Sequence, residues 1–161
     1  MDSDHSSVDT LSNGATIGSW KDRSASTNHA VQGTSANRPT HVLNGVNSKG
    51  VLAYTAGQSS DLSADSSIRS IFAVIKQAST QSAETQPFGG NISATTSGGK
   101  FGLKRTGSSM MDSGISSQSF AVVTWQMAAG NYALYINGEE RVTGTDPNAP
   151  AAFNKIGNNF A

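Results

Sequence analysis

The chain has 161 residues, which is enough for one domain with a sizeable core. Only 14% of the residues are charged, and 11 basic side chains balance 11 acidic ones. This balance lacks the dense positive charge that binding to nucleic acid or to an anionic membrane surface requires, so neither partner is predicted.

Other features of the composition narrow the class further. Cysteine is absent, which excludes disulfide bonds and thiolate metal sites. The apolar runs are far shorter than a membrane span, so no membrane insertion is predicted. The first residues, MDSDHSS, are polar and acidic, and we predict no signal peptide from them.

The first third of the chain predicts short strands separated by turns. Gly, Ser, Thr and Asn are plentiful, and such a mixture favours turns over long helices. ATIGSW follows the turn pair Asn13-Gly14, and THVL follows Pro39 and ends at the turn sequence NGVNSKG. The predicted strands are residues 15–20, 29–33, 40–43 and 50–55.

The strongest strand signal lies in SIRSIFAVIKQ, residues 67–77. Residues 71–75 form an unbroken apolar run that is rich in β-branched side chains. A short run of this kind, bounded by serine, predicts a strand rather than a helix, and predicts that both faces of the strand are covered.

The second half of the chain alternates more regularly. FGGNISATT and GKFGLKRTG precede SGISSQSFAVVTWQ, and AAFNKIGNN predicts one more short strand. In FAVVTWQ the alternation assigns Ala121, Val123 and Trp125 to one face of a strand. This face suits either the core or an exposed aromatic platform.

GNYALYINGEERVTG, residues 130–144, predicts a hairpin. Tyr132, Leu134 and Ile136 share one face of its first strand, and Ala133 and Tyr135 share the other. Asn137-Gly138 suits the positive φ angles of a type I′ turn between the two strands. Roughly ten short strands without a helix therefore predict an all-β, antiparallel sandwich or barrel.

Five segments, in order along the chain, carry a family resemblance. They are LSNGATIGSWKDRSASTNHAVQ, RPTHVLNGVNSKGVLAY, SIFAVIK, FAVVTWQMAAGNYALYINGEE and NKIGNN, and they cover most of the chain. Together they resemble the concanavalin A-like lectin/glucanase superfamily, and more narrowly its laminin-G-like branch in bacterial surface proteins and phage virion proteins. The resemblance implies a jelly-roll β-sandwich, in one domain over residues 1–161.

The chain departs from this family at three places. AYTAGQSSD stands where members usually have an aromatic-Asp-Gly sequence. The usual first apolar strand and the usual last Gly-x-x-x-Glu strand have no counterpart, so we expect a jelly roll lacking its terminal strands, with residues 1–10 as a flexible or truncated start. An unpaired sheet edge would then be exposed, and a homo-oligomer could form through it.

Carbohydrate binding needs aromatic faces and amide hydrogen-bonding groups. The candidate residues for a glycan site are Trp125, Tyr135, Asn137, Tyr132 and Asn28. Trp20 matches a family position at which we expect the ring to pack under the adjoining loop. Asn- and Ser-rich loops without net charge suit a glycan partner, and they equally suit plain solubility.

Metal binding and catalysis have weaker signals. Asp2 and Asp4 offer hard oxygen ligands that calcium accepts, as does Asp146, although a solvated acidic tail explains the first two as well. Glycosidases of this fold use paired carboxylates on one strand face, whereas Glu139 and Glu140 are adjacent and point to opposite faces. We therefore predict no enzyme activity and no obligatory cofactor.

The resemblance and the missing carboxylate pair imply a non-catalytic carbohydrate-binding or surface-adhesion module. Its partner would be a glycan or polysaccharide, and its place would be extracellular, on a cell surface or on a virion. A structural virion or appendage protein, such as a capsid decoration or tail-fibre domain, is the alternative. A glucanase relative with little or no hydrolase activity is a third possibility.

Overall fold

A computed structural model describes residues 11–22, 24–25, 27–55, 57–65, 70–77, 85–89, 92–105, 109–128, 130–145 and 153–159. The protein is all-β with antiparallel sheets, and a single short 3₁₀ turn, η2 (Ser35–Asn37), is the helical element of the described part. The chain divides into two compact units, Met1–Ser63 and Ala64–Ala161. The single domain and the character of residues 1–10 stay predictions, and residues 1–10 lie outside the described part.

The first unit is built from short strands. They are β1 (Ser19–Trp20), β2 (Ala30–Val31), β3 (Thr40–Val46), β4 (Lys49–Ala53) and, at the boundary of the units, β5 (Ser60–Asp65). β3 and β4 form a hairpin, and β2 pairs with both β1 and β5. Each of the four predicted ranges in this region contains or overlaps a strand, although β1 and β2 have only two residues each. β3 continues past its predicted end, however, and turns at Asn47 and Ser48, both with positive φ.

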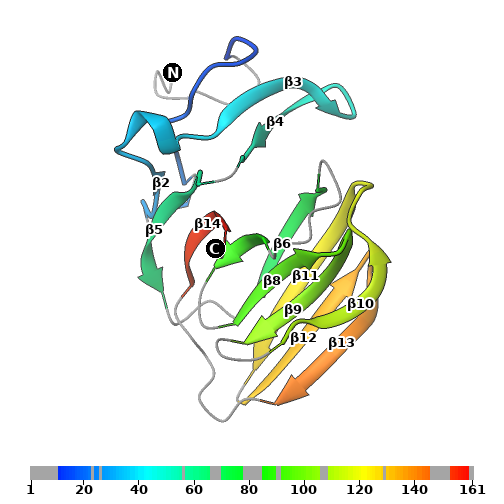
Figure 1. Ribbon diagram of the computed structural model, residues 1–161. Coiled ribbons are helices and arrows are strands. Elements are labelled where there is room, and N and C mark those ends of the chain that lie inside the picture. The colour runs from blue at the N-terminus through cyan, green and yellow to red at the C-terminus, as the bar shows by residue number, and fades with distance from the viewer. Residues whose placement is uncertain are drawn as a thin grey trace. The chain divides into compact units, whose positions relative to one another are not determined.

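The second unit contains two antiparallel sheets, consistent with a β-sandwich (Figure 1). The strands of one sheet are, in spatial order, β14 (Phe153–Asn159), β7 (Thr85–Gly89), β8 (Ile92–Ser97), β9 (Lys100–Arg105) and β10 (Met111–Ser116). The strands of the other are β13 (Glu139–Thr145), β12 (Asn131–Ile136), β11 (Ala121–Ala128) and β6 (Ser70–Ile75).

The inner faces of these sheets supply the core of the second unit. Phe101 and Leu103 of β9 are almost fully buried, as are Val123 and Trp125 of β11 and Leu134 of β12. Large apolar side chains of this kind contribute about 1.5–3 kcal/mol each when they are removed from water. The predicted alternation of β11 and β12 is confirmed, because every second residue of each strand is buried.

The prediction that β6 is covered on both faces is wrong. Ile71, Ala73 and Ile75 are partly buried, whereas the side chains of Phe72 and Val74 are 70% and 54% exposed. β6 lies at one side of an antiparallel sheet, and such a sheet commonly has one face on the core and the other in solvent.

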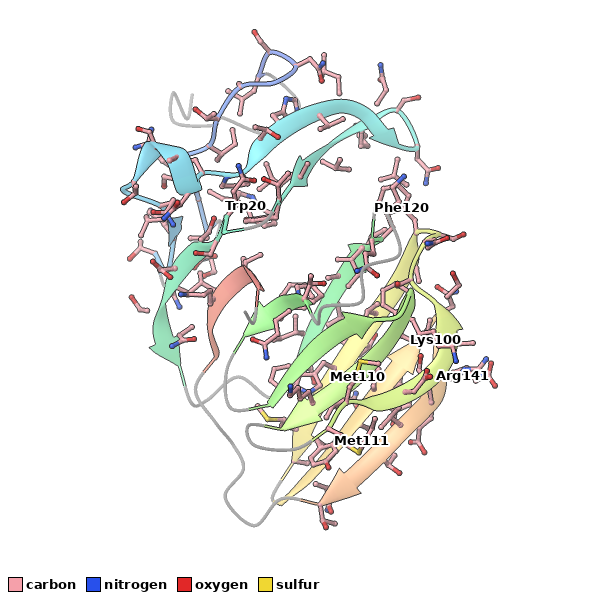
Figure 2. All side chains as sticks on the ribbon, viewed as in Figure 1. Trp20, Lys100, Met110, Met111, Phe120 and Arg141 are labelled. Atoms are coloured by element: carbon pink, nitrogen blue, oxygen red, sulfur yellow. The ribbon has the colours of Figure 1, made fainter. Side chains whose placement is uncertain are left out.

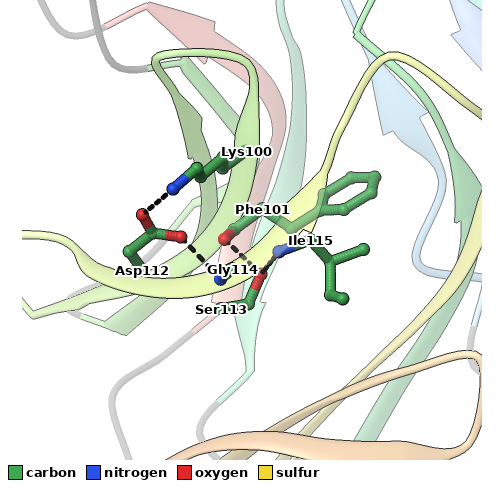
Figure 3. A network of polar contacts seen from close by, with 6 residues as sticks. All are labelled: Lys100, Phe101, Asp112, Ser113, Gly114 and Ile115. Carbon is green, nitrogen blue, oxygen red and sulfur yellow. Dashed lines mark hydrogen bonds and ion pairs between the residues drawn. The ribbon is translucent and has the colours of Figure 1, made fainter.

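Side chains replace ladder hydrogen bonds where β10 bulges away from β9 (Figure 3). The hydroxyl of Ser113 donates to the carbonyl oxygen of Phe101 at 2.6 Å and accepts the N–H of Ile115 at 3.2 Å. The carboxylate of Asp112 accepts the N–H of Gly114 at 2.7 Å. Gly114, with φ of 75°, allows the backbone to turn there.

The predicted turn between β12 and β13 is confirmed. Asn137 and Gly138 have φ angles of 53° and 85°, as a type I′ turn requires. β13 then carries a bulge, because Leu134 pairs with Val142 while Tyr135 pairs with Glu140, which leaves Arg141 as the extra residue.

Candidate functional site

The four-stranded sheet has a solvent-facing side that gathers aromatic, amide and hydroxyl groups. We name it the outer face, and it is formed by the residues that alternate with the buried ones. Its members are Ser70, Phe72, Val74, Val122, Thr124, Gln126, Ala128, Asn131, Ala133, Tyr135, Thr143 and Thr145.

Two aromatic residues flank Thr124 on the outer face. Thr124 pairs with Tyr135 on one side and with Phe72 on the other. Neighbouring strands lie about 4.8 Å apart, so the Cα atoms of Tyr135 and Phe72 lie roughly 10 Å apart across β11. Thr124 is only 8% exposed, because it lies between two larger side chains. The three residues form a line that crosses three strands.

The phenol of Tyr135 is held by the bulge in β13. Its hydroxyl donates to a carboxylate oxygen of Glu140 at 2.9 Å, and this hydrogen bond raises the pKa of Tyr135. The bulge puts Glu140 opposite Tyr135, while Arg141 pairs with the carboxylate of Glu139. Tyr135 is thus a neutral hydrogen-bond donor with an oriented ring at neutral pH.

A depression of about 400 Å³ lies beside this line. The small side chains of Ala128 and Ala133 leave the space. Polar groups of neighbouring strands border it: Gln126 pairs with Ala133, and Asn131 pairs with Thr145. The exposed lining is mostly apolar, and the amide and hydroxyl groups at its border can donate and accept hydrogen bonds. The depression therefore suits an apolar C–H face of a neutral ligand whose hydroxyl groups reach the border. Its full lining is Gln126, Ala128, Asn131, Tyr132, Ala133, Thr143, Gly144 and Thr145.

The structure places two of the predicted glycan-binding residues in the core, which corrects their assignment. Trp125 is 2% exposed and its indole Nε1 has no hydrogen-bond partner among the described residues. Tyr132 is also buried, and its hydroxyl lies 3.7 Å from the sulfur of Met111, which is marked in Figure 2. Buried rings cannot stack on a ligand from solvent, so neither residue belongs to the outer face.

The two predicted asparagines have structural partners. The amide of Asn28 accepts the N–H of Ser63 at 2.9 Å and donates to the carbonyl oxygen of the same residue at 3.3 Å. The side-chain oxygen of Asn137 accepts the N–H of Val122 at 2.9 Å. Both amides therefore act as extra backbone pairing groups, Asn28 beside β5 and Asn137 at the start of β11.

The expectation for Trp20 is wrong, because its side chain is 43% exposed rather than packed under a loop (Figure 2). The predicted metal ligands Asp2, Asp4 and Asp146 lie outside the described residues. Among the residues that are described, no group of three His, Asp or Glu side chains could hold a metal ion.

Sequence reasoning missed Phe72 and Gln126. Phe72 was assigned to a fully buried run, although Ser70 and Lys76, which share its parity along the strand, are polar. That alternation was the available signal. Gln126 is two residues from Thr124 on the same strand face, and the alternation that assigned Trp125 to one face implied that Gln126 lies on the other.

No family model matches the chain, and no curated protein or solved structure matches it. In the part of the chain that the structure describes, no helix is long and apolar enough to cross a membrane.

Proposed function

We propose that the protein is a non-catalytic carbohydrate-binding module that holds a glycan on the outer face. The observation that carries this proposal is the line of Tyr135, Thr124 and Phe72 beside the depression, which amide and hydroxyl side chains border. Aromatic rings offer apolar faces to the C–H side of a sugar ring, and amides and hydroxyls form hydrogen bonds with the hydroxyl groups of the sugar.

The length of this line favours a chain over a single sugar. Two aromatic residues whose Cα atoms lie about 10 Å apart can each contact a different sugar unit of an oligosaccharide that crosses the strands. The depression would hold a further unit against Gln126 and Asn131. The zero net charge of the protein favours a neutral glycan over a polyanionic one.

The proposal is tested with a glycan array followed by titration of the best oligosaccharide. Tyr135→Ala and Gln126→Ala should each lower affinity at least tenfold, because each removes a direct contact, while Tyr135→Phe should retain most binding. Trp20→Ala is the matched control: it removes an exposed aromatic residue of the first unit and should leave affinity unchanged. No hit on the array, or equal loss in Trp20→Ala and Tyr135→Ala, would argue against the outer face.

A structural role on a virion or appendage is the second candidate. It is favoured by the exposed apolar side chains of Phe72, Val74 and Val122, which lie together because Val122 pairs with Val74. Contiguous exposed apolar patches mark interaction surfaces. Recovery of the protein in particles, together with no glycan binding, would favour this role.

We also propose that the fold is a concanavalin A-like jelly roll of the laminin-G-like branch. The two antiparallel sheets of the second unit and the five matching sequence segments support this assignment. Because function cannot be taken from fold alone, the glycan proposal depends on the outer face and not on the family. From the same family resemblance, and from the missing carboxylate pair, we propose an extracellular, cell-surface or virion location and no enzyme activity.

A further inference from the structure

β6 is an edge strand, and its outward backbone groups can be assigned. Val122 of β11 exchanges hydrogen bonds with Asn137 through both its N–H and its carbonyl, so these groups point toward β12. Backbone direction alternates along a strand, so Val123 points toward β6 and pairs there with Ala73. The N–H and carbonyl groups of Phe72 and Val74 consequently point away from the sheet.

In the described part of the chain, β11 is the one strand that pairs with β6. Natural sheets protect such edges with charges, prolines or bulges. The opposite edge strand of the same sheet, β13, has two of these protections. Glu139, Glu140 and Arg141 are charged, and the strand contains a bulge. β6, with the sequence SIFAVI, has no charge and no proline, and its register with β11 is unbroken.

We propose that β6 pairs with β6 of a second copy, antiparallel about a two-fold axis, so that two four-stranded sheets become one eight-stranded sheet. A strand with free N–H and carbonyl groups is satisfied by another extended strand. A two-fold axis makes the interface isologous, so the same six residues serve both copies.

One register satisfies the backbone and the side chains together. With Ala73 on the axis, Phe72 lies opposite Val74 of the second copy, and the outward-pointing groups of both residues are paired. Ala73 then faces its own counterpart in a non-hydrogen-bonded pair, where the chains are closest and a small side chain fits. The exposed side of the seam is apolar, with Phe72, Val74 and the neighbouring Val122 from each copy.

The symmetric register makes a second copy the fitting occupant, because it opposes no like charges among the described residues of the seam. In this register Lys76 faces Ser70 of the second copy and not its own counterpart, so like charges are not opposed. The ammonium of Lys76 lies 4.7 Å from the ring centroid of Phe120, which keeps it beside its own strand. The protein has no net charge, so two copies do not repel one another at long range.

The size of the interface predicts its strength. Six residues of one strand are far fewer than the 20–30 residues per side of a standard interface. We therefore expect a reversible dimer with a dissociation constant on the order of micromolar or weaker, not an obligate one.

Analytical ultracentrifugation over a range of concentrations tests the proposal. The wild-type protein should shift from monomer to dimer, and Val74→Lys should remain monomeric, because it puts like charges into the seam. Gln118→Lys, which adds the same charge at an exposed position outside β6, should dimerise like the wild type. A monomer at all concentrations up to about 1 mM, or a dimer that Val74→Lys leaves intact, would overturn the proposal.

A second measurement fixes the geometry independently. The protein has no cysteine, so Ala73→Cys introduces a single thiol on the proposed axis. The Cα separation of about 4.5 Å in a non-hydrogen-bonded pair is within the range of a disulfide. Mild oxidation should crosslink Ala73→Cys into a dimer much faster than Gln118→Cys, and equal rates would overturn the pairing. Neither measurement depends on glycan binding, which Tyr135→Ala tests separately.

Discussion

The imidazole of His41 occupies the space that a side chain on Gly50 would need. A Cβ atom at Gly50 would lie 2.2 Å from Nε2 of His41. His41 is fully buried in the first unit, and its Nδ1 lies 3.3 Å from the carbonyl oxygen of Ser12. The ring of His41 therefore packs against bare backbone of β4, and Gly50 is required there for space.

Gly50→Ala should lower the free energy of unfolding by about 1–3 kcal/mol, because the added methyl overpacks a site that has no room. Chemical denaturation followed by circular dichroism measures this loss. Gly33→Ala is the matched control, since no atom lies within 4 Å of a Cβ at that position. Equal stability of the two variants would show that the ring of His41 moves aside at no cost.

At Asn137 two contributions to the free energy of unfolding can be measured separately, namely the positive φ angle and the side-chain hydrogen bond to Val122. Asn137→Ala should cost about 2 kcal/mol, because alanine is strained at a φ of 53° and the hydrogen bond to Val122 is lost. Asn137→Gly relieves the strain and loses only the hydrogen bond, so about 1 kcal/mol is expected. Thermal unfolding of both variants measures the difference. A glycine variant as unstable as the alanine variant would refute the role of the φ angle.

Alternation along the sequence predicted the faces of β11 and β12 because each strand has a continuous inner face. Trp125 and Leu134 fill the same core, and their spacing of two from other buried residues was visible without coordinates. The exposure of Phe72 could not be predicted in this way. An apolar side chain indicates that burial would be favourable, but it does not indicate whether another layer of the protein covers it.

β5 was not predicted at all, for a different reason. Its sequence, SDLSAD, has one large apolar residue, and its only alternation is that of Leu62 and Ala64 with polar neighbours, which is a weak strand signal. The strand forms because distant segments supply hydrogen-bond partners: Val31 pairs with Asp61, and the amide of Asn28 bonds the backbone of Ser63. Such tertiary pairing overrides local propensity. It also explains why Asn28 was assigned to a glycan site when its amide is used by the fold.

Asn28→Ala should consequently destabilise the first unit by about 1–2 kcal/mol, because the N–H and carbonyl of Ser63 both lose their partner. Asn28→Asp keeps the acceptor for the N–H of Ser63 but loses the donor, and should have an intermediate effect. Denaturation curves measure the stability, and oligosaccharide titration at a temperature where each variant is folded should show unchanged affinity. Loss of affinity in a folded Asn28→Ala protein would restore this residue to the binding site.

Asp112 makes the stability of the β9–β10 bulge depend on pH. The hydrogen bond from Lys100 at 2.9 Å, together with the N–H of Gly114, lowers the pKa of Asp112 below its usual 3.8 (Figure 3). A carboxyl group with a lowered folded pKa stabilises the protein above the unfolded pKa, and this contribution is lost as the pH falls through the folded value.

Asp112→Asn should therefore be less stable than the wild type at pH 7, and the difference should shrink below about pH 4. The side chains of Lys100 and Asp112 are 48% and 44% exposed, so the difference should be only about 0.2–1 kcal/mol and should weaken in high salt. Denaturation at a series of pH values measures it. Lys100→Gln provides the control: in that background the effect of Asp112→Asn should be smaller, because the larger of the two interactions is gone. A difference that stays constant from pH 7 to pH 2 would mean that the charge of Asp112 does not stabilise the bulge.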